Sequence, residues 1–217
     1  VIVGTFDAAG LVRRVRISAD GSKAILLDSE WHTNPESESV LRILDVSSPS
    51  EPLLLGSYNL DEPALGLTLS SDESLAFIAN SSNGIQVINI ADPSNPYLAG
   101  SFETEGWAYD VSLSADQQTI YVADGPTTDE VYNTPGLSGG LSIYNISNLS
   151  QVSLVGKIDT PNQTQSVTLS ADGNTAYVAD SGGGLLVVDI VNPAEPVIKH
   201  VIDTWGWANG STIVPNE

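Results

Sequence analysis

Residues 169–180 have the sequence Leu-Ser-Ala-Asp-Gly-Asn-Thr-Ala-Tyr-Val-Ala-Asp, and this stretch decides the fold because it returns along the chain. The segment that leads into it, Val167-Thr-Leu-Ser-Ala-Asp-Gly, has counterparts that begin at Val15, Leu67 and Val111. The four copies start 52, 44 and 56 residues apart. Self-similarity at such a period is the signature of a repeat protein, so the repeat has to be understood before any single motif.

Each copy is followed by three further apolar segments. In the last repeat these are Thr175-Ala-Tyr-Val-Ala-Asp180, Gly184-Leu-Leu-Val-Val-Asp-Ile190 and Pro196-Val-Ile-Lys-His-Val-Ile202. All are short, rich in Val, Ile, Leu and Tyr, and bounded by Gly, Pro, Asn, Asp or Ser, which predicts β-strands joined by turns. The Ser-Ala-Asp-Gly stretches predict hairpin turns in which Asp or Gly adopts the unusual backbone angles. The repeat therefore contains four expected strands.

The expected fold is all-β: a β-propeller of four-stranded antiparallel blades with a repeat of about 44 residues, since such repeats are typical of propeller blades. We expect residues 1–217 to form a single propeller domain or a fragment of one. The four full repeats are 11–60, 64–104, 108–160 and 164–204, and the flanking partial blades are 1–7 and 205–217. Each partial blade matches only one strand, which predicts a partial ring within a parent of about six to eight blades.

Two parts of the last repeat carry a family resemblance. The stretch Gly184-Leu-Leu-Val-Val-Asp-Ile-Val-Asn-Pro-Ala-Glu-Pro-Val197, together with Ala176-Tyr-Val-Ala-Asp180, resembles the LVIVD-repeat propellers. Residues 169–180 are also similar to the related YVTN-type blades. The resemblance covers nearly the whole chain. It implies a secreted or surface-exposed bacterial or archaeal propeller, often one module of a larger protein, whose molecular function is generally undefined.

Charge and composition narrow the classes of partner. The chain has 7 Lys plus Arg against 27 Asp plus Glu, a formal net charge of −20 that repels nucleic acid and anionic lipid headgroups. Its longest apolar runs are far shorter than the roughly 20 residues that span a bilayer. We therefore expect neither a nucleic-acid partner nor membrane insertion. The absence of cysteine and the acidic, Ser- and Asn-rich composition favour a secreted or cell-surface protein.

The sequence has no nucleophile elbow, phosphate-binding loop, dinucleotide fingerprint or histidine metal motif. Its strongest polar pattern is an Asx residue at the end of each second strand: Asp28, Asn80, Asp124 and Asp180. One hypothesis is that each side chain caps the turn that follows it. The alternative is that these oxygens bind Ca²⁺, the one cofactor we consider, although no loop has the Asp-x-Asp-x-Asp-Gly spacing.

The loops that lead into the first strands should surround the mouth of the central channel. They contribute Arg14, Gly66, Asp110, Ser166 and Gly210 at matched positions. Propeller lactonases and related hydrolases place several carboxylates around an axial metal, whereas here Asp110 is the one obvious ligand. A metal-dependent, lactonase-like hydrolase is therefore the alternative to a binding protein, and an enzyme is the less favoured of the two.

Candidate binding residues come from two places. Aromatic side chains precede two of the channel positions. They could contact a ligand, or they could instead pack between blades. Two insertions, 29–39 and 125–139, follow the second strand of their repeats and so should project from one face. Repeat proteins commonly place binding sites on such loops, and neutral variation of the loops is the alternative explanation. With Asp110, the candidates are Trp31, His32, Trp107, Tyr132, Trp205 and Trp207. The predicted function is a secreted or cell-surface platform for binding or assembly with protein or glycan partners.

Overall fold

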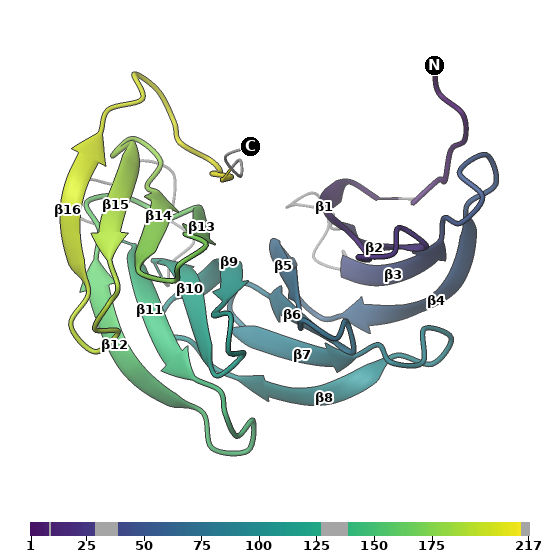
Figure 1. Ribbon diagram of the computed structural model, residues 1–217, viewed down its shortest axis with the longest axis horizontal. Coiled ribbons are helices and arrows are strands. Elements are labelled where there is room, and N and C mark those ends of the chain that lie inside the picture. The colour runs from purple at the N-terminus through teal and green to yellow at the C-terminus, as the bar shows by residue number, and fades with distance from the viewer. Residues whose placement is uncertain (9, 29–38, 127–138, 214–217) are drawn as a thin grey trace.

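The computed structural model describes residues 1–8, 10–28, 39–126 and 139–213. Sixteen β-strands lie within these ranges and form four antiparallel four-stranded sheets, each built from consecutive strands. Figure 1 shows the sheets side by side around an arc, with the first strand of each sheet on the inside and the fourth on the outside. The predicted all-β fold with four-stranded blades is confirmed, and the arc is open. Among the described residues, no helix is long and apolar enough for a membrane crossing.

We number the blades 1 to 4 along the chain. Blade 1 consists of β1 (Val12–Ile17), β2 (Lys23–Asp28), β3 (Ser39–Asp45) and β4 (Leu53–Leu60). Blade 2 consists of β5 (Gly66–Leu69), β6 (Leu75–Ala79), β7 (Ile85–Asn89) and β8 (Tyr97–Phe102). Blade 3 consists of β9 (Trp107–Leu113), β10 (Thr119–Gly125), β11 (Gly140–Asn145) and β12 (Ser153–Asp159). Blade 4 consists of β13 (Ser166–Leu169), β14 (Thr175–Ala179), β15 (Leu185–Asp189) and β16 (Val197–Ile202).

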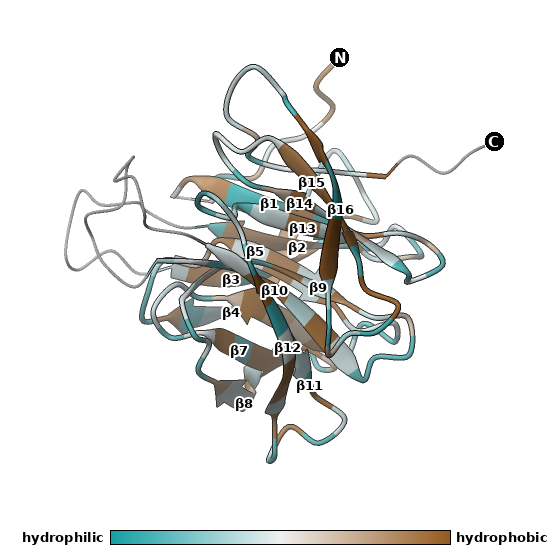
Figure 2. Ribbon diagram, turned by 90° about the vertical axis from the view of Figure 1, so that its left-hand side faces the viewer, coloured by the Kyte–Doolittle hydropathy of each residue, from teal (hydrophilic) through white to brown (hydrophobic). Residues whose placement is uncertain are grey.

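Each inner blade packs against both of its neighbours because its strands are apolar on both faces. In β6, Ala76 and Ile78 pack against blade 1, whereas Phe77 and Ala79 pack against blade 3. Successive side chains of a strand point to opposite faces, so alternate residues serve two interfaces. Figure 2 shows the result as brown, apolar strands joined by paler and teal turns. Burial of a side chain such as Ile78 stabilises the fold by about 1.5–3 kcal/mol.

Blade 4 shows the same surface without a neighbour. Leu141 and Ile143 of β11 are fully buried between blades 3 and 4. Their counterparts in β15, Leu185 and Val187, are only half-buried. The far face of blade 4 thus has the apolar pattern of an interface, but no further four-stranded sheet covers it in the described part of the chain.

Residues 205–213 lie beside blade 4 as an inner strand would. The N–H of Ala208 donates to the Ser181 carbonyl at 2.9 Å, just as the N–H of Ala108 in β9 donates to the Ser81 carbonyl at 3.0 Å. Each contact is an isolated β-bridge between an inner strand and the turn after the second strand of the preceding blade. The C-terminal segment therefore repeats the placement of β9 without pairing into a sheet.

The N-terminal segment shows a similar placement against blade 1. Residues 1–7 form no strand, yet a Cβ added at Gly4 would clash with the carbonyl oxygen of Pro49 in the turn between β3 and β4. Gly56 in β4 meets the Pro93 carbonyl of blade 2 in the same way. Glycine is required at both positions because an outer segment crosses the backbone of the next blade closely.

The hairpins between first and second strands repeat one hydrogen-bond pattern. In every blade a Ser hydroxyl donates at 2.6 Å to the Asp two residues later. The positive φ falls on the residue after that Asp, which is Gly21, Glu73, Gln117 or Gly173. The sequence predicted that Asp or Gly would adopt these angles, whereas in blades 2 and 3 the longer side chains of Glu73 and Gln117 take the strained position. Glu73 and Gln117 accept a backbone N–H from the hairpin of the preceding blade, at 2.6 and 3.0 Å, and so link neighbouring blades.

Candidate functional site

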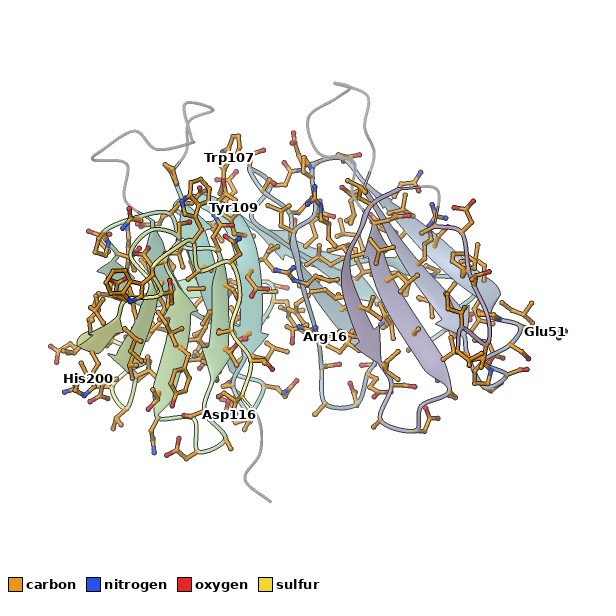
Figure 3. The ribbon with its side chains drawn as sticks, turned by 90° about the horizontal axis from the view of Figure 1, so that it is seen from above. Arg16, Glu51, Trp107, Tyr109, Asp116 and His200 are labelled. Atoms are coloured by element: carbon orange, nitrogen blue, oxygen red, sulfur yellow. The ribbon has the colours of Figure 1, made fainter. Side chains whose placement is uncertain are left out.

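A pocket of about 470 Å³ opens where the first strands begin. We call it the axial pocket, the end of the propeller that carries it the mouth face, and the opposite end the hairpin face. Figure 3 shows Tyr109 near the mouth face and Asp116 at the hairpin face. The described residues that line the pocket are Arg13, Arg14, Leu65, Tyr109, Gln163, Gln165, Trp207 and Asn209.

Five of these lining residues occupy one equivalent place in the repeat. We call it the mouth position, and its occupants are Arg13, Leu65, Tyr109, Gln165 and Asn209. Each directly precedes one of the channel residues expected from the sequence. No two mouth positions hold the same side chain, although the residues around them recur from blade to blade. That variation within a regular repeat is the signal by which the sequence could have indicated them.

Three of the five expected channel residues lie deeper than the pocket. Gly66, Asp110 and Ser166 are buried, Gly210 is exposed, and Arg14 alone of the five lines the pocket. A Cβ built at Gly66 would lie 2.6 Å from the Cα of Asp110. Only glycine therefore allows β5 and β9 to approach so closely. The structure places these residues beneath the pocket, where inner strands of different blades meet.

Asp110 joins three blades at this level. Its Oδ1 lies 3.9 Å from Nη2 of Arg14 in blade 1. Its Oδ2 accepts the backbone N–H of Val167 in blade 4 at 3.3 Å. Burial raises the pKa of Asp110, and the Arg14 charge and the Ser166 hydroxyl oppose that rise. Asp110 is thus placed to hold Arg14 beside the pocket from below.

The predicted tryptophans are distributed unevenly. Trp207 lines the pocket and is 55% exposed. Trp205, two residues earlier, is 95% exposed and has a φ of 54°, and its N–H donates to Oδ1 of Asp203 at 2.8 Å. Trp107 begins β9 at the mouth face near Tyr109 (Figure 3), but it is not among the lining residues. The structure therefore brings Trp207 to the site together with Tyr109, the aromatic residue that directly precedes Asp110 and was not among the candidate binding residues.

Three further predicted residues fall outside the described ranges. Trp31 and His32 belong to residues 29–38, and Tyr132 belongs to residues 127–138. Their proposed part in binding stays a prediction from the sequence.

The Asx residues at the ends of the second strands are spread one to a blade. Asp28 accepts a hydrogen bond from Nε of Arg42 in β3 at 2.8 Å. Asp180 accepts the N–H of Asn162, at 3.1 Å to Oδ2. That donor belongs to the loop before β13, whereas the turn after Asp180 is closed by backbone hydrogen bonds. The interaction in blade 4 thus differs from the expected cap on the following turn.

Asn80 and Asp124 have different surroundings. Both are buried, and their side-chain oxygen and nitrogen atoms have no hydrogen-bond partner among the described residues. Burial raises the pKa of Asp124 to about 7, although nearby Ser142 and Lys157 favour the charged form. One position of the repeat thus holds a neutral amide in blade 2 and a carboxyl that titrates near neutral pH in blade 3.

The described residues contain no group of three or more His, Cys, Asp or Glu side chains arranged to hold a metal ion. Because the four Asx residues belong to four different blades, they do not form one shared site. Calcium binding by Asp28, Asn80, Asp124 or Asp180 stays a prediction.

The sequence model of one protein family matches this chain. It is described as the LVIVD repeat, and it matches residues 37–60, 70–104, 137–160 and 163–204, which together are more than half of the chain. A search of the curated proteins found no match.

Solved structures share the architecture at low identity. A candidate 6-phosphogluconolactonase from Bacteroides fragilis NCTC 9343 is 15% identical with a TM-score of 0.67, and the match covers 92% of this chain and 56% of that one. A functionally unknown protein from Desulfotomaculum acetoxidans DSM 771 is 11% identical with a TM-score of 0.57, and the match covers 93% and 74%. The chain thus spans little more than half of the first protein. At such identities the likeness shows the fold alone.

Proposed function

Because this chain belongs to the LVIVD repeat family of β-propellers, we propose that it is a binding module of a secreted or cell-surface protein and that its mouth face takes a glycan. The axial pocket is the observation that carries this proposal. A repeated scaffold there presents a different side chain from each repeat, so one ligand contacts several blades at once. Recognition sites are commonly built in this way, on variable positions held by a rigid frame.

The chemistry of the lining residues favours a sugar. Trp207, whose side chain is 55% exposed, offers aromatic surface on which the apolar face of a sugar ring stacks, and the buried ring of Tyr109 forms part of the pocket wall. Gln163, Gln165 and Asn209 offer amides, which both donate to and accept from hydroxyl groups. The volume of about 470 Å³ lies within the roughly 300–1,000 Å³ typical of small-ligand sites. These features together suit a short oligosaccharide better than a flat protein surface.

The extracellular location rests on composition. A net charge of −20 and the lack of cysteine are compatible with a protein that stays soluble outside the cell. The second candidate ligand for the same face is a protein, since an exposed indole such as that of Trp205 commonly anchors protein–protein contacts.

A metal-dependent hydrolase receives less support. Asp110 is the one carboxylate among the matched channel residues, and it lies buried beneath the pocket against Arg14. The candidate lactonase shares the fold at 15% identity, which does not extend to its activity.

The proposal is tested by titrating the protein with soluble oligosaccharides in a calorimeter. Trp207→Ala should weaken binding about tenfold or more because an aromatic contact in the pocket is removed. Trp205→Ala is the matched control, since that indole lies two residues away and outside the pocket, and it should change the affinity less than twofold. Equal effects of the two substitutions, or no binding of any glycan at millimolar concentration, would contradict the proposal.

A further inference from the structure

The positive charge of this protein is concentrated at the axis. Strand β1 carries Arg13, Arg14 and Arg16, three of the seven Lys and Arg residues of the whole chain. Two of the three line the axial pocket. The chain has 27 acidic residues, yet none of the eight described residues that line the pocket is acidic. The lining of the pocket therefore carries a charge opposite in sign to that of the molecule, with Asp110 beneath it as the partner of Arg14.

We propose that the axial pocket binds a sugar that carries a carboxylate, such as a uronic acid residue of an oligosaccharide. This inference rests on the proposed glycan-binding function and names the class of glycan. Arginine suits the role because its planar guanidinium donates two parallel hydrogen bonds to a carboxylate. Arg14 is already oriented from below by Asp110 at 3.9 Å, and Arg13 supplies the second guanidinium at the mouth position.

The net charge of −20 does not prevent such binding. Charges more than about 10 Å away are largely screened at 0.1 M salt, so a short ligand in the pocket responds mainly to the nearest groups. A long polyanion such as nucleic acid extends beyond the pocket and meets the acidic surface. The pocket thus suits a short anionic group on a sugar.

The other lining residues complete the recognition of a sugar ring. Trp207 provides an indole that is 55% exposed, and the buried ring of Tyr109 occupies the mouth position of blade 3. Gln165 and Asn209 place amides at the mouth positions of the last two repeats. An anion alone would need only the arginines, whereas this combination of aromatic, amide and guanidinium groups matches an acidic saccharide.

The experiment compares trigalacturonate with its trimethyl ester, which has the same sugar rings without the charges. Calorimetric titration at 0.1 M salt should show that the wild-type protein binds the free acid at least about tenfold more tightly, because a charge-assisted hydrogen bond is worth about that factor. Arg13→Gln should reduce this preference about tenfold, whereas Arg13→Lys should retain part of it. The urea midpoint of each variant checks that it is folded.

A matched control separates local from overall charge. Lys199→Gln removes one positive charge from β16 on the outer rim, where the lysine pairs with Asp189 at 3.1 Å, and it should leave the preference unchanged. Equal binding of acid and ester would overturn the acidic-sugar inference and leave the glycan-binding proposal standing. Equal effects of Arg13→Gln and Lys199→Gln would also overturn the inference. If neither ligand nor any other glycan binds, the proposed function fails as well.

Discussion

At the hairpin face the four blades are almost copies of one another, whereas at the mouth face they differ. Every hairpin has a Ser hydroxyl that donates to an Asp at 2.6 Å, and the N–H two residues after that Asp donates to the same carboxylate. At the other end of the same first strands, the mouth positions hold five different side chains: Arg13, Leu65, Tyr109, Gln165 and Asn209. Both regions belong to one repeat, so the difference reflects what each region has to do.

The hairpin sequences recur because each hairpin closes the same type of turn and packs beside the equivalent hairpin of the next blade. A change there costs stability in whichever blade carries it. The mouth positions range from buried, at Leu65 and Tyr109, to exposed, at Asn209, so packing does not impose one residue type on all of them. Repetition in this protein thus marks residues with a structural role, and we propose that the loss of repetition at the mouth positions marks the binding surface.

The largest expected effect comes from the repeated interior. Leu141→Ala should lower the free energy of unfolding by about 4 kcal/mol, because Leu141 is fully buried between blades 3 and 4 and its removal leaves a cavity. Leu185→Ala makes the same change at the equivalent position of blade 4, where the side chain is only half-buried, and should cost less than about 2 kcal/mol. Urea unfolding of both variants measures the difference. Similar losses would mean that the far face of blade 4 is covered in solution.

The sequence predicted the blades well because the repeat is carried by local patterns. The third segment of the last repeat, expected at 184–190, is β15 at Leu185–Asp189, and the second, expected at 175–180, is β14 at Thr175–Ala179. Residues 1–7 match a fourth strand in sequence but form none. A strand needs a partner for its N–H and C=O groups, and a sequence motif cannot supply one.

Aligning the repeats selected five channel residues, of which Arg14 alone lines the axial pocket among the described residues. Other lining residues directly precede the selected ones, as Tyr109 precedes Asp110. Neighbouring side chains of a strand point to opposite sides, so Tyr109 and Asp110 have different surroundings. Alignment shows which residues are equivalent, but the direction in which they point depends on the twist and packing of the inner strands.

Asp124 is buried and its carboxyl oxygens have no hydrogen-bond partner among the described residues, so its replacement should have the next largest effect on stability. Asp124→Asn installs the amide that Asn80 already provides in blade 2. A carboxyl with a pKa of about 7 in the fold and about 3.9 in the unfolded chain destabilises the fold at high pH by about 4 kcal/mol. Because the new amide is itself buried, we expect a net gain of about 3 kcal/mol at pH 8, measured by urea unfolding.

The pH dependence provides a sharper test of the same substitution. Between about pH 4 and 7 the folded Asp124 keeps a proton that the unfolded chain has lost, so stability falls as the pH rises and levels off above about 7. The hairpin aspartates act in the opposite sense, since hydrogen bonds hold the pKa of Asp72 down to about 2 and their contribution is lost as the pH falls below about 4. Asp124→Asn should make the decline between pH 4 and 7 clearly shallower without changing the loss below pH 4, and the remaining decline comes from Asp110 and Asp180, whose pKa values burial also raises. An unchanged profile would show that Asp124 is solvated in solution.

The smallest effect tests why the hairpins of blades 2 and 3 depart from glycine. Gln117 has a φ of 61°, a conformation that costs a non-glycine residue about 1 kcal/mol, but its side chain accepts the Ser71 N–H of blade 2 at 3.0 Å. Gln117→Ala keeps the strain and loses the bond, so it should lower stability by about 1 kcal/mol. Gln117→Gly loses the bond and also removes the strain, so its stability should stay within about 0.5 kcal/mol of the wild type. Neither variant should alter glycan affinity, because the hairpin lies at the end of β9 opposite the pocket; a change in affinity would show that the two faces are coupled through the inner strands.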